Sequence, residues 1–263
     1  MTDQAVHYAK DARGIVRVTL NRPEKRNAFS GEIIRQLTEA FNKAAGDPDC
    51  RAVVLAGEGK HFSAGADLNY MQHSASLTPE ENRDDARALA AMLQALDKLP
   101  KPTIARVQGA VYGGAVGLVC ACDMAIASDD ARFCLSEARL GLAPAAIGPY
   151  VVRVLGERQS RRYFLTSEEI SASGAEAFGL VHDVTSRESL DGVIDILIQR
   201  LLGNGPTALT ACKELIARCG QSAPDQALVE YTANLIADLR TGTEGQEGLK
   251  AFLEKRKASW VQE

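Results

Sequence analysis

The sequence predicts an α/β fold built from strand–helix units and completed by a helical C-terminal region. Two observations predict this class. Apolar strand-like runs alternate with amphipathic helical segments before Pro149, and from Pro149 onward the pattern is almost entirely helical. Alternating strands and helices indicate βαβ units with mostly parallel pairing and right-handed crossovers. A turn-forming Gly-Asn-Gly-Pro segment at 203–206 divides a predicted core, residues 1–200, from predicted C-terminal helices, residues 201–263.

The first predicted elements are two strands with a helix between them. Residues 15–20 alternate in hydrophobicity, and residues 52–55 form a short apolar run followed by glycines, as strands do. Ser30 is positioned to cap the intervening helix. The apolar residues of that helix recur at helical spacing on one face. They are Ile33, Ile34, Leu37, Phe41 and Ala44.

A second amphipathic helix is predicted over residues 79–99, with Pro79 in its first turn and acidic residues close behind. Its apolar stripe consists of Ala86, Leu89, Ala90, Leu93 and Leu96. The pattern then predicts a strand over 103–107, a glycine-rich turn, a buried helix and a strand over 124–127.

Composition excludes several classes of function. The 263 residues are 46% hydrophobic and 24% charged, which is ordinary globular usage. Lys and Arg number 30 against 34 Asp and Glu, a net charge of −4, so no basic excess favours nucleic acid as a partner. The longest uncharged stretch, 107–122, is shorter than the roughly 20 apolar residues of a membrane span. We therefore expect neither nucleic acid nor membrane as a partner.

The cysteines and histidines give no sign of a disulfide framework or a metal site. The six cysteines show no paired spacing, and the four histidines no ligand spacing. The N-terminal segment lacks the apolar region of a secretory signal. These features predict a protein of the reducing cytoplasm that holds no metal.

Two turns rich in small residues are candidate sites, HFSAGADL at 61–68 and VYGGAVG at 111–117. Such turns leave backbone N–H groups uncovered, and a helix beginning near Gly114 adds the positive end of its dipole. Two convergent N–H donors form an oxyanion hole, which stabilises negative charge on a carbonyl oxygen. The alternative is that the glycines serve only tight turns and close packing. Neither turn has P-loop or dinucleotide-binding spacing.

Glu137 is the candidate acid or base. It follows an apolar strand and precedes the turn at 141–144. Partial burial there would raise its pKa toward the range of general acid–base catalysis. The alternative is a surface carboxylate paired with Arg132 or Arg139. Ser63 and Ser136 lie in no nucleophile motif, which disfavours a serine hydrolase.

Together these residues resemble the crotonase (enoyl-CoA hydratase/isomerase) superfamily over nearly the full chain. Five motifs occur in the family's order and spacing, and as a set they are specific. They are NRPEKRNA at 21–28, HFSAGADL at 61–68, QGAVYGG at 108–114 with Cys122-Asp123 after it, LSEARLGLAP at 135–144, and the helix over 245–257.

The resemblance implies a spiral of ββα units with a helical C-terminal trimerisation region, and trimers that pair as hexamers. It implies an acyl-CoA thioester as substrate, with no further cofactor because coenzyme A belongs to the substrate. Its carbonyl oxygen would meet the N–H groups of Ala66 and Gly114, and Glu137 would be the catalytic acid and base. The residues implied for substrate or CoA binding are Arg22, Lys25, Ala28, Ala64, Ala66, Asp67, Leu68, Asn69 and Gly114.

The chain departs from the pattern of the family's hydratases at one position. Those enzymes typically hold water with two glutamates, of which one aligns with Glu137 and the other with Gly117. A single glutamate also suits the Δ3-Δ2-enoyl-CoA isomerases. Residues 113–126, 142–152 and 161–163 nevertheless resemble bacterial hydratases of methylglutaconyl-CoA in leucine catabolism, and a sister group acting on isohexenylglutaconyl-CoA in terpene degradation.

The preferred interpretation is therefore a hydro-lyase acting on a branched, carboxylated 2-enoyl-CoA. The alternatives are an isomerase using the same residues and, more remotely, an inactive CoA-thioester-binding protein. A distal carboxylate in the substrate would need a cation in the pocket. The candidates are Lys60, His61, His73, Arg139, Arg153 and the cluster Arg158, Arg161 and Arg162.

Overall fold

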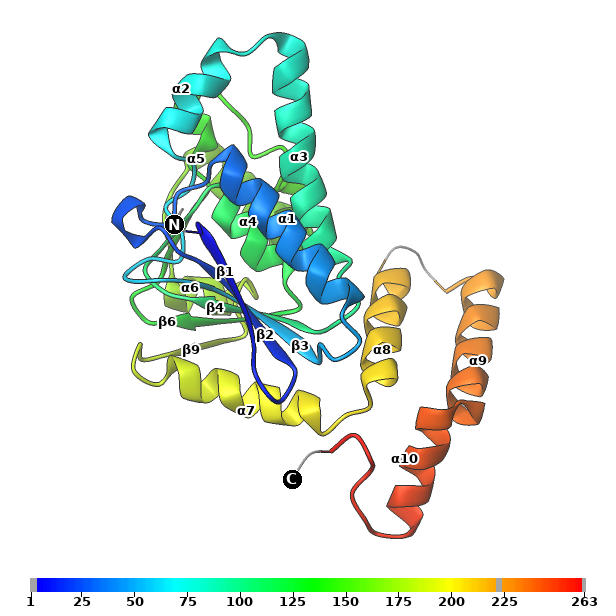
Figure 1. Ribbon diagram of the computed structural model, residues 1–263. Coiled ribbons are helices and arrows are strands. Elements are labelled where there is room, and N and C mark those ends of the chain that lie inside the picture. Colours follow the sequence, from blue (N-terminus) through cyan, green and yellow to red (C-terminus); the bar gives the residue numbers. More distant parts are fainter. Residues whose placement is uncertain (1–3, 221–223, 262–263) are drawn as a thin grey trace.

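A six-stranded sheet forms the centre of the molecule in the computed structural model, which describes residues 4–220 and 224–261 (Figure 1). Its strand order is β1-β2-β3-β4-β6-β9. The first pair is antiparallel and the others are parallel. The strands are β1 (Val6–Lys10), β2 (Ile15–Leu20), β3 (Ala52–Gly57), β4 (Thr103–Val107), β6 (Met124–Ser128) and β9 (Asp183–Thr185).

Helices cover both faces of this sheet. Helices α1 (Gly31–Gly46), α3 (Pro79–Asp97) and α4 (Gly114–Ala121) lie on one face, and α7 (Leu190–Leu202) lies on the other (Figure 1). Successive side chains of a strand point to opposite faces. Val53 and Leu55 therefore join the larger core, whereas Val54 packs with Ile194 of α7 in a smaller one.

A second, three-stranded sheet positions the loops of interest. It consists of β5 (Ala110–Tyr112), β7 (Arg132–Cys134) and β8 (Ile170–Ser171) in the order β5-β7-β8. The remaining elements of the core are η1 (Pro23–Lys25), α2 (Leu68–Ser76), η2 (Glu137–Leu140), α5 (Gly148–Thr166) and α6 (Ala172–Ala177). Strand β5 leads directly into Gly113 and α4, and β7 leads into η2. This small sheet thus brings the two segments side by side.

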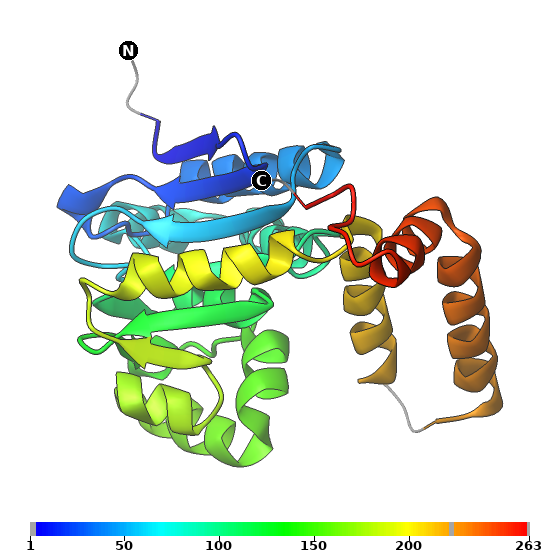
Figure 2. The same ribbon diagram turned by 90° about the horizontal axis from the view of Figure 1, so that it is seen from below.

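Three C-terminal helices stand beside the sheet and its covering helices (Figures 1 and 2). They are α8 (Pro206–Cys219), α9 (Gln226–Thr241) and α10 (Thr243–Leu253). Arg51, next to β3, holds the segments that flank these helices. Its guanidinium donates to the carbonyl oxygens of Leu202 and Asn204, before α8, and of Trp260, after α10.

The predicted α/β class is confirmed, and so are most of the predicted elements. The strands over 15–20 and 103–107 have the predicted bounds, and Ser30 caps α1 by accepting the Ile33 N–H at 3.4 Å. The helix predicted to reach residue 99 ends at Asp97. The sequence did not reveal β1, β8, β9 or α2. The division at residue 200 stays a prediction.

Candidate active site

The first candidate donor, Ala66, lies in a turn held by the backbone of Phe29. The Phe29 N–H donates to the Gly65 carbonyl oxygen at 2.7 Å, and the Asp67 N–H donates to the Phe29 carbonyl oxygen at 2.8 Å. Gly65 adopts a φ of +93°, which favours glycine. Within residues 4–220 and 224–261, the Ala66 N–H has no backbone or side-chain acceptor. This donor is therefore free to bind an oxygen.

The second candidate donor, Gly114, opens α4. Gly113 precedes it with a φ of +55° and donates its N–H to the Cys134 carbonyl oxygen at 2.9 Å. The Gly114 N–H also has no acceptor in the described part of the chain, as expected for the first turn of a helix. A bridge between Ser63 and Val111 joins the two turns, so both donors belong to one backbone framework.

Phe29 also contacts the second turn with its side chain. A Cβ placed on Gly114 would lie 2.8 Å from Phe29 Cε2 and 3.1 Å from its Cδ2. The ring, which is only 4% exposed, therefore packs closely on the Gly114 backbone. One residue thus holds Ala66 by its main chain and Gly114 by its ring. The sequence patterns did not reveal this residue.

Glu137 begins η2 and reaches back toward the second donor turn at Gly113. Its Oε1 lies 3.3 Å from the position that a Cβ on Gly113 would occupy. Its Oε2 is buried without a hydrogen-bond partner in the described residues. Burial raises the pKa of the Glu137 carboxyl, and a hydrogen bond from the backbone opposes this only in part. This agrees with the desolvation expected from the sequence, and the carboxyl is suited to exchange protons with a ligand.

No second carboxylate stands beside Glu137 at position 117. A Cβ on Gly117 would overlap Cγ2 of Ile147 and would lie 3.4 Å from Cδ2 of Leu93. Both neighbours are apolar and buried. The space that a side chain at 117 would need is therefore already filled by Ile147 and Leu93.

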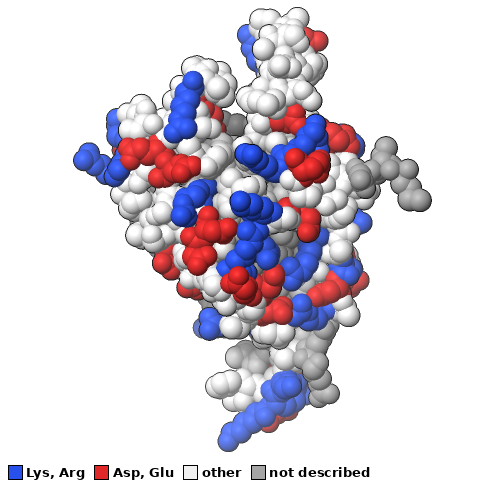
Figure 3. Space-filling view, turned by 90° about the vertical axis from the view of Figure 1, so that its left-hand side faces the viewer, with Lys and Arg blue, Asp and Glu red and all other residues white. Residues whose placement is uncertain are grey.

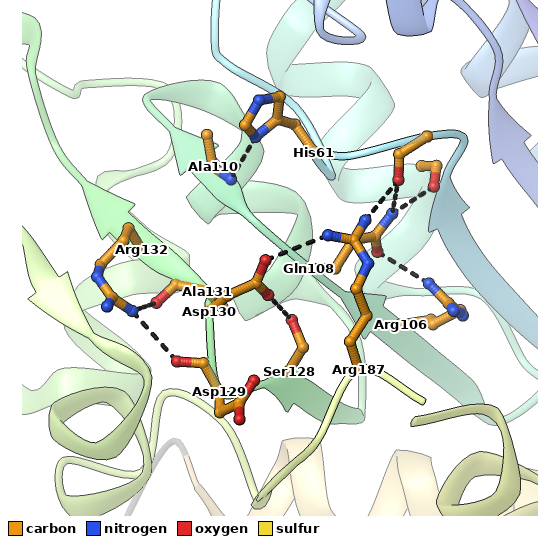
Figure 4. Close-up of polar contacts among 12 residues, drawn as sticks. His61, Arg106, Gln108, Ala110, Ser128, Asp129, Asp130, Ala131, Arg132 and Arg187 are labelled. Atoms are coloured by element: carbon orange, nitrogen blue, oxygen red, sulfur yellow. Dashed lines mark hydrogen bonds and ion pairs between the residues drawn. The ribbon is translucent and has the colours of Figure 1, made fainter. Parts of the chain in front are cut away.

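A polar network holds the loop that leads into the first donor turn (Figure 4). Gln108 donates to the Gly57 carbonyl oxygen at 2.6 Å, and Arg187 donates to that of Gly59 at 2.7 Å. Arg187 also pairs with Asp130 at 3.1 Å. His61 Nδ1 accepts the Ala110 N–H at 3.0 Å. These contacts fix the backbone of residues 57–61, and this in turn positions the segment Phe62–Ala66 that follows.

The residues predicted to bind CoA lie around the first donor turn. Arg22 and Lys25 of the η1 segment approach Asp67 Oδ2 at 3.5 and 3.6 Å. Burial would raise the pKa of Asp67, but the Asn69 N–H and these two cations lower it. The carboxylate also caps α2, which contains Leu68 and Asn69, and Leu68 is 74% exposed.

Ala64 and Ala28, which were also predicted to bind CoA, lie in the same region. The Ala64 N–H donates to the Arg26 carbonyl oxygen at 2.9 Å, and the Ala28 N–H to that of Lys25 at 3.1 Å. All nine predicted binding positions thus lie in the two donor turns, in the η1 segment beside the first turn, or in the first turn of α2. Their role in CoA binding stays a prediction.

The candidate cations are dispersed, and several already have partners. Arg153 pairs with Asp97, Arg161 with Glu157 and Arg162 with Glu168. Burial, together with nearby cations, lowers the pKa of His61, so this ring is neutral at physiological pH. Arg139 of η2 donates to the Ser167 carbonyl oxygen and has no carboxylate partner within the described ranges.

The surface charges, the metal-binding residue types and the helix hydropathy can be described for the residues in the structure. Basic and acidic side chains are interspersed on the face shown in Figure 3, without a large basic patch. In the described part of the chain, no group of three His, Cys, Asp or Glu side chains is arranged to hold a metal ion. No described helix combines the length and apolar character of a membrane span.

Comparisons with known proteins cover almost the whole chain. Residues 10–263 match the family model described as enoyl-CoA hydratase/isomerase. A crystal structure of an enoyl-CoA hydratase from Shewanella pealeana superposes with a TM-score of 0.94 at 41% identity, covering 97% of this chain and 96% of that one.

Two curated relatives have different named activities. The 2,3-dehydroadipyl-CoA hydratase of Escherichia coli is 34% identical over 245 residues, 92% of this chain and 93% of its own. The trans-2-decenoyl-acyl-carrier-protein isomerase of Streptococcus mutans is 31% identical over 256 residues, 94% of this chain and 95% of its own.

Proposed function

We propose that this chain, which belongs to the enoyl-CoA hydratase/isomerase family, adds water across the double bond of a 2-enoyl-CoA thioester. Membership supports an enzyme of the hydratase type acting on an acyl-CoA thioester. The observation that carries the proposal is the position of Glu137. Its buried, unpartnered Oε2 belongs to a carboxyl that lies over Gly113, next to the Gly114 donor, whose N–H has no acceptor in the described chain.

The geometry suggests how the reaction proceeds. The Ala66 and Gly114 N–H groups bind the thioester oxygen. Glu137 takes a proton from water while the water oxygen bonds to the β carbon and the electrons of the double bond move onto the thioester oxygen. The two donors stabilise this enolate, each by about 3 kcal/mol. Glu137 then returns the proton to the α carbon, and the carbonyl forms again.

Isomerisation of an enoyl-CoA is the second candidate function. The filled space at Gly117 favours it, because one carboxylate is enough to move a proton along the enolate whereas no second acid helps to hold water. The isomerase relative from Streptococcus mutans gives the same indication. Hydration remains the proposal because the relative with the solved structure and the Escherichia coli relative are both named hydratases.

The substrate we propose is branched and carboxylated, with 3-methylglutaconyl-CoA as the example. The dehydroadipyl-CoA named for the Escherichia coli relative also bears a distal carboxylate. Arg139 is our choice for its counter-ion, because it shares η2 with Glu137 and lacks a carboxylate partner in the described residues. Arg139→Gln should raise KM about tenfold for the carboxylated thioester and leave crotonyl-CoA unaffected.

The proposal also covers the cofactor, the oligomeric state and the cellular location. Coenzyme A enters only as part of the substrate, and no resident cofactor takes part. The subunits form trimers or hexamers through the C-terminal helices. A cytoplasmic location is supported by the six cysteines, all of which are unpaired in the structure.

The test is turnover of crotonyl-CoA and 3-methylglutaconyl-CoA by the Glu137→Gln variant. We expect kcat to fall by about 10²–10⁴-fold, the usual contribution of general acid–base catalysis, with thioester affinity within a few-fold. Glu157→Gln on α5 is the matched control, since this carboxylate is exposed and, among the described residues, pairs only with Arg161. Near-full turnover by Glu137→Gln would refute the proposed role.

A further inference from the structure

The side of α4 that bears the second donor continues past Glu137 to Gly117. Gly113 is the N-cap of α4 and Gly117 follows it by four residues, about one helical turn, so their Cα atoms lie about 5–6 Å apart along the helix. The Glu137 carboxyl lies over Gly113. Whatever covers Gly117 is therefore the next group that an acyl chain meets after it has passed the carboxyl.

Ile147 covers Gly117. A Cβ on this glycine would overlap Ile147 Cγ2 and would lie 2.7 Å from Ile147 Cβ. Ile147 is 2% exposed, and Leu93 of α3 closes the other side. The isoleucine comes from the end of the segment between η2 and α5. Residues 137–147 thus supply both the carboxyl that lies over Gly113 and the branched side chain that lies over Gly117.

We propose that Ile147 is a specificity-determining residue, whose side chain fills the space at Gly117 and thereby limits the size of the group that the β carbon of the substrate can bear. The inference rests on the proposed function, because the two donors fix the thioester oxygen at the start of α4. The α and β carbons then extend along this side of the helix, past Glu137 and toward Ile147. A small branch fits, and a larger one meets the isoleucine.

The test compares two 2-enoyl-CoA thioesters that differ by one methylene in the substituent on the β carbon, methyl or ethyl. In wild type we expect the methyl compound to have the higher kcat/KM. Ile147→Ala opens the space at Gly117, so the ethyl-to-methyl ratio of kcat/KM should rise about tenfold or more. Ile147→Val keeps a Cγ methyl group over Gly117 and removes only the terminal Cδ1, so the ratio should change much less than in Ile147→Ala.

Ile194→Ala is the matched control. Ile194 is an equally buried isoleucine on α7, in the smaller core on the opposite face of the sheet. The Ile194→Ala variant should lose thermal stability and keep the wild-type ethyl-to-methyl ratio of kcat/KM. An unchanged ratio in the Ile147→Ala variant, with turnover retained, would overturn this inference alone. A wild-type enzyme that converts neither thioester would overturn the proposed function, and this inference with it.

A second readout tests the packing without any turnover. Gly117→Ala should lower the melting temperature sharply, because its methyl group overlaps Ile147. In the Ile147→Ala background the nearest atom, Cγ2, is gone and only the contact with Cβ at 2.7 Å remains. The loss of melting temperature in the double variant should therefore be smaller than the sum of the losses in the two single variants. Additive losses in the double variant would show that Ile147 does not fill this space.

Discussion

Phe29 connects the two proposed donors, because its main chain holds the Ala66 turn and its ring packs on Gly114. Replacing it by leucine keeps the main-chain bonds and removes the ring. We expect Phe29→Leu to lower kcat at least about tenfold with KM within a few-fold, because a displaced oxyanion donor affects the transition state most.

Phe41→Leu on α1 is the control for this prediction. Phe41 is fully buried in the same core, so both variants should lose about 1–3 kcal/mol of unfolding free energy. Only the change at Phe29 should lower kcat. Equal effects of the two variants on kcat would mean that Phe29 is an ordinary core residue.

The raised pKa of Glu137 predicts a pH dependence of stability. Burial favours the protonated carboxyl in the folded protein, so the folded state binds more protons than the unfolded chain at pH values above the ordinary 4.5. Wild type therefore loses stability as pH rises through this window, and Glu137→Gln does not. The melting temperature of the variant relative to wild type should increase between about pH 4 and pH 8. A difference that is constant with pH would mean that the carboxyl is not desolvated.

At the scale of elements, Glu244 links two C-terminal helices. Its carboxylate, on α10, accepts the N–H groups of Thr207 and Ala208 at the start of α8, both at 2.9 Å. These donors have no partner within their own helix. Glu244→Ala should lower the unfolding free energy by about 1–2 kcal/mol, measured by denaturant titration. Glu254→Ala, at the end of α10, is the control and should change it by less than about 0.5 kcal/mol.

Elements with strong periodicity were predictable from the sequence, and short or exposed ones were not. Strand β2 and helix α1 show clear apolar alternation and spacing, and both appear as expected. In β1 only Val6 is buried, because an edge strand need not alternate, so its pattern carries little information. The strands β5, β7 and β8 have two or three residues each, which is too short for any period.

Some residues of the candidate site were likewise predictable from the sequence, and others were not. Glycines at 113 and 114 mark the second donor turn by composition alone, and a glutamate after a strand marks Glu137. Phe29 and Ile147 carry no such local sign. Their roles depend on contacts with Gly114 and Gly117, which only the fold brings near them.

For the whole molecule, the exposed apolar residues of the C-terminal helices predict self-association. No described residue of α8 or α9 is buried in the single chain. Phe252 and Leu253 of α10 are 82% and 79% exposed, which is unusual for a soluble monomer. Sedimentation equilibrium at micromolar concentration should give three or six times the subunit mass of 28.2 kDa. A mass equal to one subunit would contradict the prediction.

The most direct test of the central claim is hydration of 3-methylglutaconyl-CoA in water labelled with heavy oxygen. Hydration places solvent oxygen on the β carbon of the product, whereas isomerisation moves the double bond and leaves the oxygen content unchanged. Mass spectrometry of the product from wild type should show one labelled oxygen per turnover, with the rate reduced about 10²–10⁴-fold in Glu137→Gln. A shifted double bond without label, or equal labelling rates in the two proteins, would contradict hydration by Glu137.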